Sequence, residues 1–255
     1  MLDSARNQRG AAMILLHTFG PFMGAADPSP FVLKAMALLR MAGAPYRTTV
    51  GNPLTAPRRF LPMIEEDGVK TPDSALIRAW IEDRCGYDFD AGLTPTEKAV
   101  SLSMQRLCED HLYFEMMHAR WCDDEVFELG LGRHMFEAFP PPLRPLIKAM
   151  LRRSNTARLR GQGIGRHGAE QVAAFGVQDI DALGAFLRDK PFLMGANPCG
   201  ADASLFGIVE AILTPPLAIR LRTATAGHAN LVAYRDRFAR RYFPELFEAK
   251  LKVAA

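Results

Sequence analysis

The chain has 255 residues, enough for one large domain or two modest ones. Hydrophobic residues make up 49% of it and charged residues 23%, so the composition favours a packed core and excludes a mainly disordered chain. Lys and Arg number 31 against 28 Asp and Glu, and the net charge of +3 provides no general attraction to nucleic acid or to anionic lipid.

Four cysteines are spread along the chain, at Cys85, Cys108, Cys122 and Cys199. No two of them have the CxxC spacing of a zinc site, and four are too few for a disulfide framework in a chain of this length. Free thiols are typical of a reducing compartment, so we expect a cytoplasmic protein. No apolar stretch approaches the ~18–20 residues that cross a bilayer, so we predict no membrane span.

The first elements have clear local signals. Residues 1–12 are predicted to be a flexible leader, and the apolar run Met13–Phe19 predicts a buried strand. A helix is expected to follow, because Ser29 is a good N-cap residue and Pro30 is tolerated at the first helical position. Gly43 is the expected stop of this helix.

The next segments alternate between strand and helix signals. The Asp67-Gly68 pair is typical of a hairpin turn, and Asp73 is a suitable helix cap. The elements predicted in order are strands at Tyr46–Val50, Leu61–Glu65 and Val69–Thr71 and a helix from Asp73 to near Gly86. Residues 13–86 are therefore predicted to form a small mixed α/β domain.

From residue 95 onward the apolar periodicity is helical almost throughout. The composition changes near residues 87–95, where we place the domain boundary. The predicted helices cover residues 95–121, 124–137, 142–160, 167–189, 202–214 and 229–241. Residues 96–255 are therefore predicted to form an all-helical domain without a sheet.

Two predicted helix starts carry polar side chains that suit an anionic ligand. Ser29 lies where unpaired backbone amides and a partial positive charge favour an anion, although a plain helix cap is the alternative. Asp73 and Ser74 begin the next helix and could hold an ammonium group and a carboxylate, unless Asp73 is only a cap. Pro62 at a strand start indicates a cis peptide or an open edge, and a bend there leaves the backbone of Leu61 free.

In this order and spacing, these motifs resemble the serine-type glutathione S-transferases. Ser29–Phe31, with Gly43 and Tyr46 behind it, is similar to their first helix. Leu61-Pro62 followed by Asp73-Ser74 is similar to their cis-proline strand and glutamyl-binding turn. The resemblance implies an α/β plus all-α fold, in which a thioredoxin-like N-terminal domain precedes a helical-bundle C-terminal domain.

The C-terminal half resembles one branch of this superfamily, the failed-axon-connections and metaxin-like proteins. Each motif is weak alone, but the order of the motifs is specific, and the resemblance covers nearly the whole chain from residue 13. The segments that carry it are His111–Phe114, Arg120-Trp121, Gly163–His167, Lys190–Gly195, Ala201–Ala203, Asn230-Leu231 and Arg241–Pro244.

The resemblance also implies roles for individual residues. Ser29 would be the catalytic residue, donating a hydrogen bond that favours the thiolate of glutathione. The position near the end of the first strand that holds a catalytic tyrosine in other classes corresponds to Phe19, which has no hydroxyl. The residues implied to bind glutathione are Arg59 (or Arg58) at the glycyl carboxylate, Leu61 and cis-Pro62 at the cysteinyl part, and Asp73 and Ser74 at the γ-glutamyl group.

Other residues receive supporting or rival roles. Phe22, Tyr113 and Met117 are expected to form walls of the acceptor site, and Asp202 is expected to be a structural helix cap. Glu115 and His118 form half of a Glu-x-x-His di-iron motif, but its second copy is absent, so we predict no metal.

The leading hypothesis is an enzyme that conjugates glutathione, as its substrate, to a hydrophobic electrophile. We further expect a role in detoxification and a homodimer, as among the relatives. Two alternatives remain open: a non-catalytic glutathione-binding protein, and an interaction protein of the metaxin type with a vestigial site.

Overall fold

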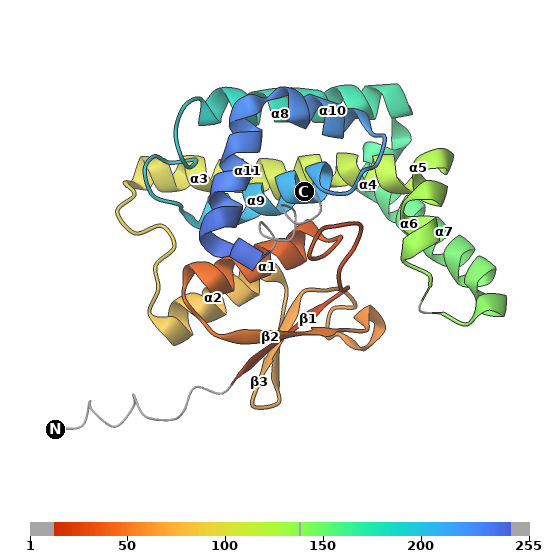
Figure 1. The fold of residues 1–255 in the computed structure, drawn as a ribbon, viewed down its shortest axis with the longest axis horizontal. Coiled ribbons are helices and arrows are strands. Elements are labelled where there is room, and N and C mark those ends of the chain that lie inside the picture. The colour runs from red at the N-terminus through yellow and green to blue at the C-terminus, as the bar shows by residue number, and fades with distance from the viewer. Residues whose placement is uncertain (1–12, 138, 246–255) are drawn as a thin grey trace.

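The computed structural model describes residues 13–137 and 139–245, so the predicted leader at residues 1–12 lies outside the described residues. A small α/β unit built around one sheet forms one end of the molecule, and helices are stacked above it (Figure 1). This is the predicted fold class, a thioredoxin-like domain followed by a helical domain. Within the described residues, no helix is both long and apolar enough to cross a membrane.

The sheet has four strands in the order β2-β1-β3-β4. Their bounds are Ile14–Thr18 for β1, Tyr46–Val50 for β2, Met63–Glu66 for β3 and Val69–Pro72 for β4. β1 runs parallel to β2, and both pairs that involve β3 are antiparallel. The third strand begins at Met63 rather than at the predicted Leu61, because Pro62 has no N–H for a ladder.

Helix α1 (Pro30–Met41) lies between the sheet and the helical unit (Figure 1). Ten of its twelve residues are buried, on every side of the helix, as expected for a helix enclosed by two layers. Its N-terminal turn closely approaches α9 (Gly200–Leu213), because a Cβ on Gly207 would lie only 2.4 Å from the carbonyl oxygen of Pro30. Helix α2 (Ser74–Cys85) packs against β3 and β4.

A long helical segment crosses the C-terminal unit but is not one α-helix. α3 (Pro95–Arg106) passes into a π-helical stretch, Leu107–Leu112, which continues as α4 (Tyr113–Trp121). The predicted helix at 124–137 is divided into α5 (Asp124–Leu129) and α6 (Leu131–His134). The break falls at Gly130, where a Cβ would lie 2.6 Å from Leu217.

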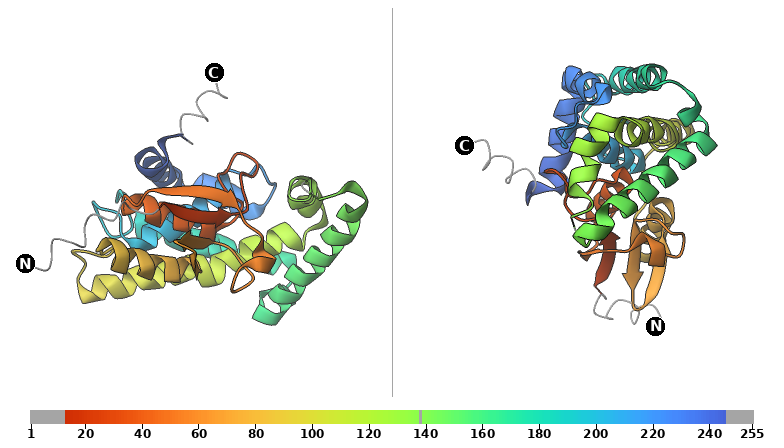
Figure 2. Two further views of the ribbon diagram at one scale, coloured as in Figure 1. Left: turned by 90° about the horizontal axis from the view of Figure 1, so that it is seen from below. Right: turned by 90° about the vertical axis from the view of Figure 1, so that its right-hand side faces the viewer.

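The remaining helices pack against this segment or against one another (Figure 2). One of them, α10, was not predicted, because its eight residues follow a proline-containing loop and carry little apolar pattern. The bounds are Arg144–Gln162 for α7, Ala169–Leu187 for α8, Arg220–Gly227 for α10 and Ala229–Tyr242 for α11. Between residues 100 and 240 the described chain forms no sheet, only an isolated bridge between Phe192 and Gly195.

The main apolar core is shared by both units. It joins strand residues such as Leu16 and Ile64 to residues of α9 and α11 such as Phe206 and Phe238, with α1 between them. A second cluster lies beneath the loop after β1, where Phe22 packs with Trp121 and Phe127. The loop that carries the start of α1 is thus attached to both units.

Candidate functional site

The predicted site residues converge because of the register of the sheet. β1 and β3 are antiparallel, with His17 opposite Met63, so the end of β1 lies beside Leu61 and Pro62. Met63 is in turn opposite Pro72, and the backbone N–H of Asp73 donates to the carbonyl of Pro62 over 3.0 Å. The loop that leads to Ser29, the Leu61-Pro62 peptide and the start of α2 therefore lie together at one end of the strands.

Leu61 and Pro62 form a free backbone edge before Met63, where the pairing of β3 with β1 and β4 begins. The peptide between them is cis, and both residues are buried. Within the described residues, neither the N–H nor the C=O of Leu61 makes a hydrogen bond, whereas the carbonyl of Pro62 is paired with Asp73. A peptide ligand laid along this edge can therefore pair with Leu61 in the manner of an added strand.

Asp73 and Ser74 form the start of α2 at the same edge. Asp73 adopts a left-handed φ of 76°, and its Oδ1 accepts from Ala75 N over 2.9 Å. Its second oxygen, Oδ2, lies 3.6 Å from the guanidinium of Arg58 and is accessible. The Ser74 hydroxyl makes no hydrogen bond within the described residues, although the residue is only 4% exposed. The pair thus offers one carboxylate oxygen for an ammonium group and a hydroxyl at a helix N-terminus for a carboxylate.

The two arginines near this edge differ in placement. Arg58 is the one that contacts Asp73, while the predicted Arg59 is exposed and has a left-handed φ of 57°. A positive charge beside Asp73 suits a ligand that carries both an ammonium group and carboxylates. Arg58 is therefore at least as well placed as Arg59 to meet a ligand carboxylate.

Ser29 caps α1 at the same edge. Its Oγ accepts weakly from Val32 N over 3.4 Å, and within the described residues its own hydroxyl hydrogen has no acceptor. Its backbone N–H donates over 2.8 Å to Oδ1 of Asp27, a residue that the sequence analysis did not single out. A thiol placed here would face a hydroxyl donor and the positive end of the α1 dipole, both of which favour the thiolate.

Asp27 holds the loop between β1 and α1 in shape. Its Oδ2 accepts from Phe19 N over 2.7 Å and from Gly20 N over 3.2 Å, in addition to the bond from Ser29. The side chain has no exposed surface, and burial raises its pKa to about 7, although the three amide donors act in the opposite direction. One buried carboxyl group therefore fixes the end of β1 relative to Ser29.

Next to the start of α1, the domains meet around aromatic rings and a buried ion pair. Phe31 and Tyr113 contact edge to face with their ring centres 4.7 Å apart. A small pocket beside them is lined by Lys34, whose Nζ lies 2.5 Å from Oε1 of Glu109. Ser204 also donates to Glu109 over 2.6 Å. Burial lowers the pKa of Lys34, and the Glu109 carboxylate opposes that shift.

The three predicted acceptor-site residues differ in exposure. Tyr113 and Met117 are half-buried on α4. Phe22 is only 5% exposed and belongs to the second apolar cluster, with Met117 packed against that cluster. Tyr113 therefore lies beside Phe31, whereas Phe22 and Met117 belong to the second apolar cluster.

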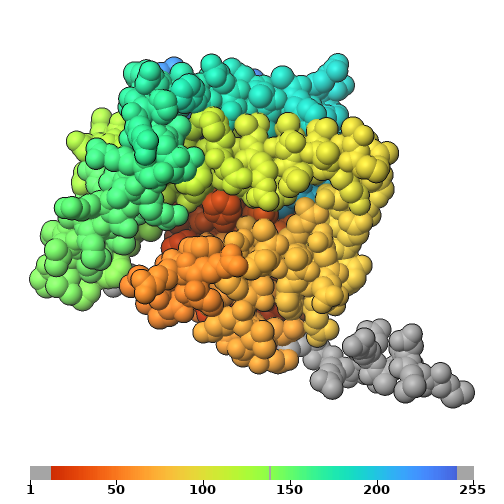
Figure 3. All heavy atoms as spheres, turned by 180° about the vertical axis from the view of Figure 1, so that it is seen from behind, coloured from red at the N-terminus to blue at the C-terminus, as the bar shows by residue number. Residues whose placement is uncertain are grey.

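The surface has a recess where the N-terminal α/β unit meets the helical unit. Figure 3 shows a recess between the orange segment around residues 50–65 and the yellow-green α3 and α4, with red chain from the first part of the sequence at its floor. The green α7 borders the recess on one side. A ligand bound at the Leu61 edge would face an opening bounded by both units.

Asp202 lies in the helical core. Its Oδ2 accepts from Cys199 N over 2.8 Å, its Oδ1 accepts from Leu193 N over 3.0 Å, and its side chain is fully buried. The hydroxyl of Tyr234 donates to its backbone carbonyl. These are the contacts of a structural cap that ties the start of α9 to the preceding loop.

A four-stranded mixed sheet with free backbone groups at Leu61 and two helix starts around them makes residues 13–86 a thioredoxin-like domain with a site for a peptide-like ligand. Models of the glutathione S-transferase N-terminal and C-terminal domains match residues 30–126 and 176–238. The chain is 32% identical to the isoprene-epoxide–glutathione S-transferase of Rhodococcus sp. (strain AD45), over 90% of this chain and 99% of that protein. The protein described here belongs to the glutathione S-transferase family.

More distant relatives fall in the branch that the sequence indicated. Failed axon connections of Drosophila melanogaster is 27% identical, and the match covers 88% of this chain but 57% of that protein. Metaxin-2 of Mus musculus is 23% identical over 86% of this chain and 84% of its own length. Among solved structures, a glutathione transferase of Phanerochaete chrysosporium has a TM-score of 0.64 at 14% identity, covering 91% of this chain and 98% of its own.

Proposed function

We propose that this protein joins glutathione, through its sulfur, to a hydrophobic electrophile. The observation that carries the proposal is the unpaired backbone of Leu61 beside cis-Pro62, at the sheet edge that also holds Ser29 and the start of α2. Glutathione has a peptide backbone for that edge, an ammonium group for Asp73 Oδ2, and carboxylates for Ser74 and Arg58. Its thiol would then be directed towards Ser29.

In this mechanism Ser29 stabilises the attacking thiolate. The serine hydroxyl donates to sulfur, and the α1 dipole favours the negative charge, so the thiol loses its proton near neutral pH. The thiolate attacks an electrophilic carbon, forming the C–S bond while the carbon–leaving-group bond breaks. We propose epoxides as one substrate class, since the relative from Rhodococcus is an isoprene-epoxide transferase. There the C–O bond breaks and the oxygen takes up a proton.

A pH–rate profile of Ser29→Ala tests this role. We expect slower conjugation at neutral pH and a smaller defect at alkaline pH, where the thiolate forms without help. Ser103→Ala is the matched control, because that exposed hydroxyl only donates to Ala99 within its own helix. If the profiles of both variants run parallel to that of the unmodified protein and only the melting temperature changes, Ser29 is a helix cap and not a catalytic residue.

A non-catalytic glutathione carrier is the second candidate function. It is favoured by the lack of a hydroxyl at Phe19 and by the similarity to metaxins and to failed axon connections. Retention on immobilised glutathione without conjugation of several electrophiles would identify the carrier. Loss of retention as well would leave an interaction protein with a vestigial site.

We also propose that the protein is a cytoplasmic homodimer that acts in detoxification. The four cysteines are free in the structure, which supports a reducing compartment. Cell fractionation tests the location, and light scattering during gel filtration tests the dimer. Sensitivity of a deletion strain to epoxides tests the role in detoxification.

A further inference from the structure

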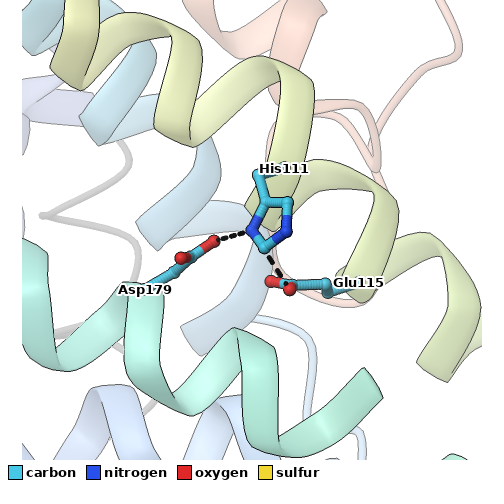
Figure 4. Close-up of side chains that lie close together, drawn as sticks. All are labelled: His111, Glu115 and Asp179. Carbon is cyan, nitrogen blue, oxygen red and sulfur yellow. Dashed lines mark hydrogen bonds and ion pairs between the residues drawn. The ribbon is translucent and has the colours of Figure 1, made fainter. Parts of the chain in front are cut away.

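His111, Glu115 and Asp179 meet on the face of the long helical segment that is turned towards α8 (Figure 4). His111 Nδ1 lies 2.5 Å from Oδ2 of Asp179 and 3.3 Å from Oε1 of Glu115. One potential ligand atom from each residue lies within 4.8 Å of the others. The sequence analysis predicted no metal, and it could not place Asp179 beside the other two residues.

Glu115 is the unusual member of this group. Its side chain is fully buried and points at the other two residues (Figure 4), and although His111 Nδ1 lies 3.3 Å from Oε1, neither carboxylate oxygen accepts a well-formed hydrogen bond within the described residues. A buried carboxylate that accepts no hydrogen bond is costly unless a cation or a proton compensates it. Burial and the nearby Asp179 carboxylate raise the pKa of Glu115 to about 8.

The backbone around the three residues also supports a binding role. His111 lies in the π-helical stretch, a rare conformation that occurs frequently at functional sites. On α8, Gly176 leaves room for the carboxylate, since a Cβ there would lie 3.1 Å from Oε2 of Glu115. The His111 side chain is 47% exposed, so the cluster is open to solvent on one side.

We propose that His111, Glu115 and Asp179 bind a divalent transition-metal ion of the zinc type. One imidazole nitrogen and two carboxylates are ligands that Zn²⁺ accepts, with water completing the coordination. Tetrahedral Zn²⁺ with bonds of about 2.1 Å sets its ligand atoms about 3.4 Å apart. The distance from Nδ1 to Glu115 matches this spacing, and that to Asp179 needs only a side-chain adjustment.

This site is separate from the glutathione edge. Residues that are two positions apart in a helix lie about 200° apart around its axis, so the side chains of His111 and Tyr113 face opposite ways. Tyr113 packs against Phe31 of α1, whereas His111 faces α8. A bound ion would join the π-helical stretch to α8, two segments separated by 68 residues, and would stabilise the helical unit.

Calorimetric titration of the untagged protein with Zn²⁺ tests the proposal, in a Cys85→Ser background that removes an exposed thiol. We expect one site per chain, with proton release that shows up as heats dependent on the buffer. Glu115→Gln and Asp179→Asn should each weaken binding by at least about tenfold. Zn²⁺ should also raise the melting temperature of the parent protein and not that of these variants.

The matched control is His228→Ala, because His228 and Asp181 form a similar pair with a distance of 2.7 Å but no buried third carboxylate. Its affinity for Zn²⁺ should remain within about twofold of the parent protein, a change worth under 1 kcal/mol. If Glu115→Gln fails to fold, His111→Ala replaces it as the ligand variant, because the exposed His111 side chain can be removed with less effect on folding. No binding at saturating Zn²⁺, or binding that is equal in all the ligand variants, would overturn the proposal.

Discussion

Asp27→Asn is the variant that most directly tests how the loop before α1 is held. The substitution keeps the shape of the side chain but replaces one acceptor oxygen with a donor NH₂ group. At least one of the amides of Phe19, Gly20 and Ser29 then loses its partner. A buried donor left unpaired costs about 1–3 kcal/mol, so we expect a loss of that size in the free energy of unfolding at pH 5.

The size of this loss should depend on pH. The pKa of Asp27 in the folded protein, about 7, lies above its ordinary 3.8, so between these values the folded state binds more protons than the unfolded state. The stability contributed by this group is therefore complete at low pH and falls as the pH rises towards 7, by up to about 1.4 kcal/mol per pH unit. Asparagine does not titrate, so the difference in the free energy of unfolding between the two proteins should shrink from pH 5 to pH 7 by up to about 3 kcal/mol, enough to cancel or reverse it.

Urea denaturation followed by circular dichroism at several pH values measures this gap directly. Subtracting the two curves cancels every other titrating group. Asp123→Asn is a suitable control, because Asp123 caps α5 in an exposed position and asparagine caps a helix equally well. Equal stability of Asp27→Asn and the parent protein at pH 5, or a gap that stays constant up to pH 8, would refute the reasoning. The KM for glutathione should also rise severalfold, since Ser29 loses a fixed backbone contact.

Three further predictions concern the ligand edge and the junction of the domains. Asp73→Ala should weaken glutathione binding by about ten- to a hundredfold in a calorimetric titration, the effect of losing a charged hydrogen bond; unchanged affinity would exclude the glutamyl role. Glu109→Ala should cost about 3–5 kcal/mol in chemical denaturation, because Lys34 is left buried and unpaired, whereas replacing both residues together, Lys34→Met with Glu109→Leu, should recover only part of it, since Ser204 and Gln105 still lose their acceptor. Gly207→Ala should lower the melting temperature and the conjugation rate by displacing the start of α1, while Gly161→Ala, with open space around it, should be neutral or slightly stabilising.

Most elements of the fold have local signals in the sequence. Ser29 with Pro30, and Asp73 before Ser74, fix helix starts through the chemistry of caps, and these starts are where predicted. The π-helical stretch has no such signal, because a change from i→i+4 to i→i+5 hydrogen bonds needs no special composition. The break at Gly130 depends on a close approach of Leu217, which a local pattern does not contain.

Some residues of the candidate site likewise have local sequence signals, whereas others meet only through long-range packing. Leu61, Pro62 and Asp73 are contiguous with turns and caps, and their meeting follows from the register of neighbouring strands. Lys34 and Glu109 are separated by 75 residues, and their contact depends on the packing of α1 against the helical unit. Asp27 looked like an ordinary loop residue, because its three hydrogen bonds go to backbone amides that have no sequence signature.

The enclosure of α1 has a consequence for how the chain is assembled. Because this helix is buried on every side, residues 13–86 alone would leave much of its surface in water, and the helical unit alone would lack the same partner. A nick in the connection between α2 and α3 should therefore leave the fragments bound to each other, and neither should refold when separated. Amides of α1 should be among the last to exchange with deuterium, opening only when the whole molecule unfolds.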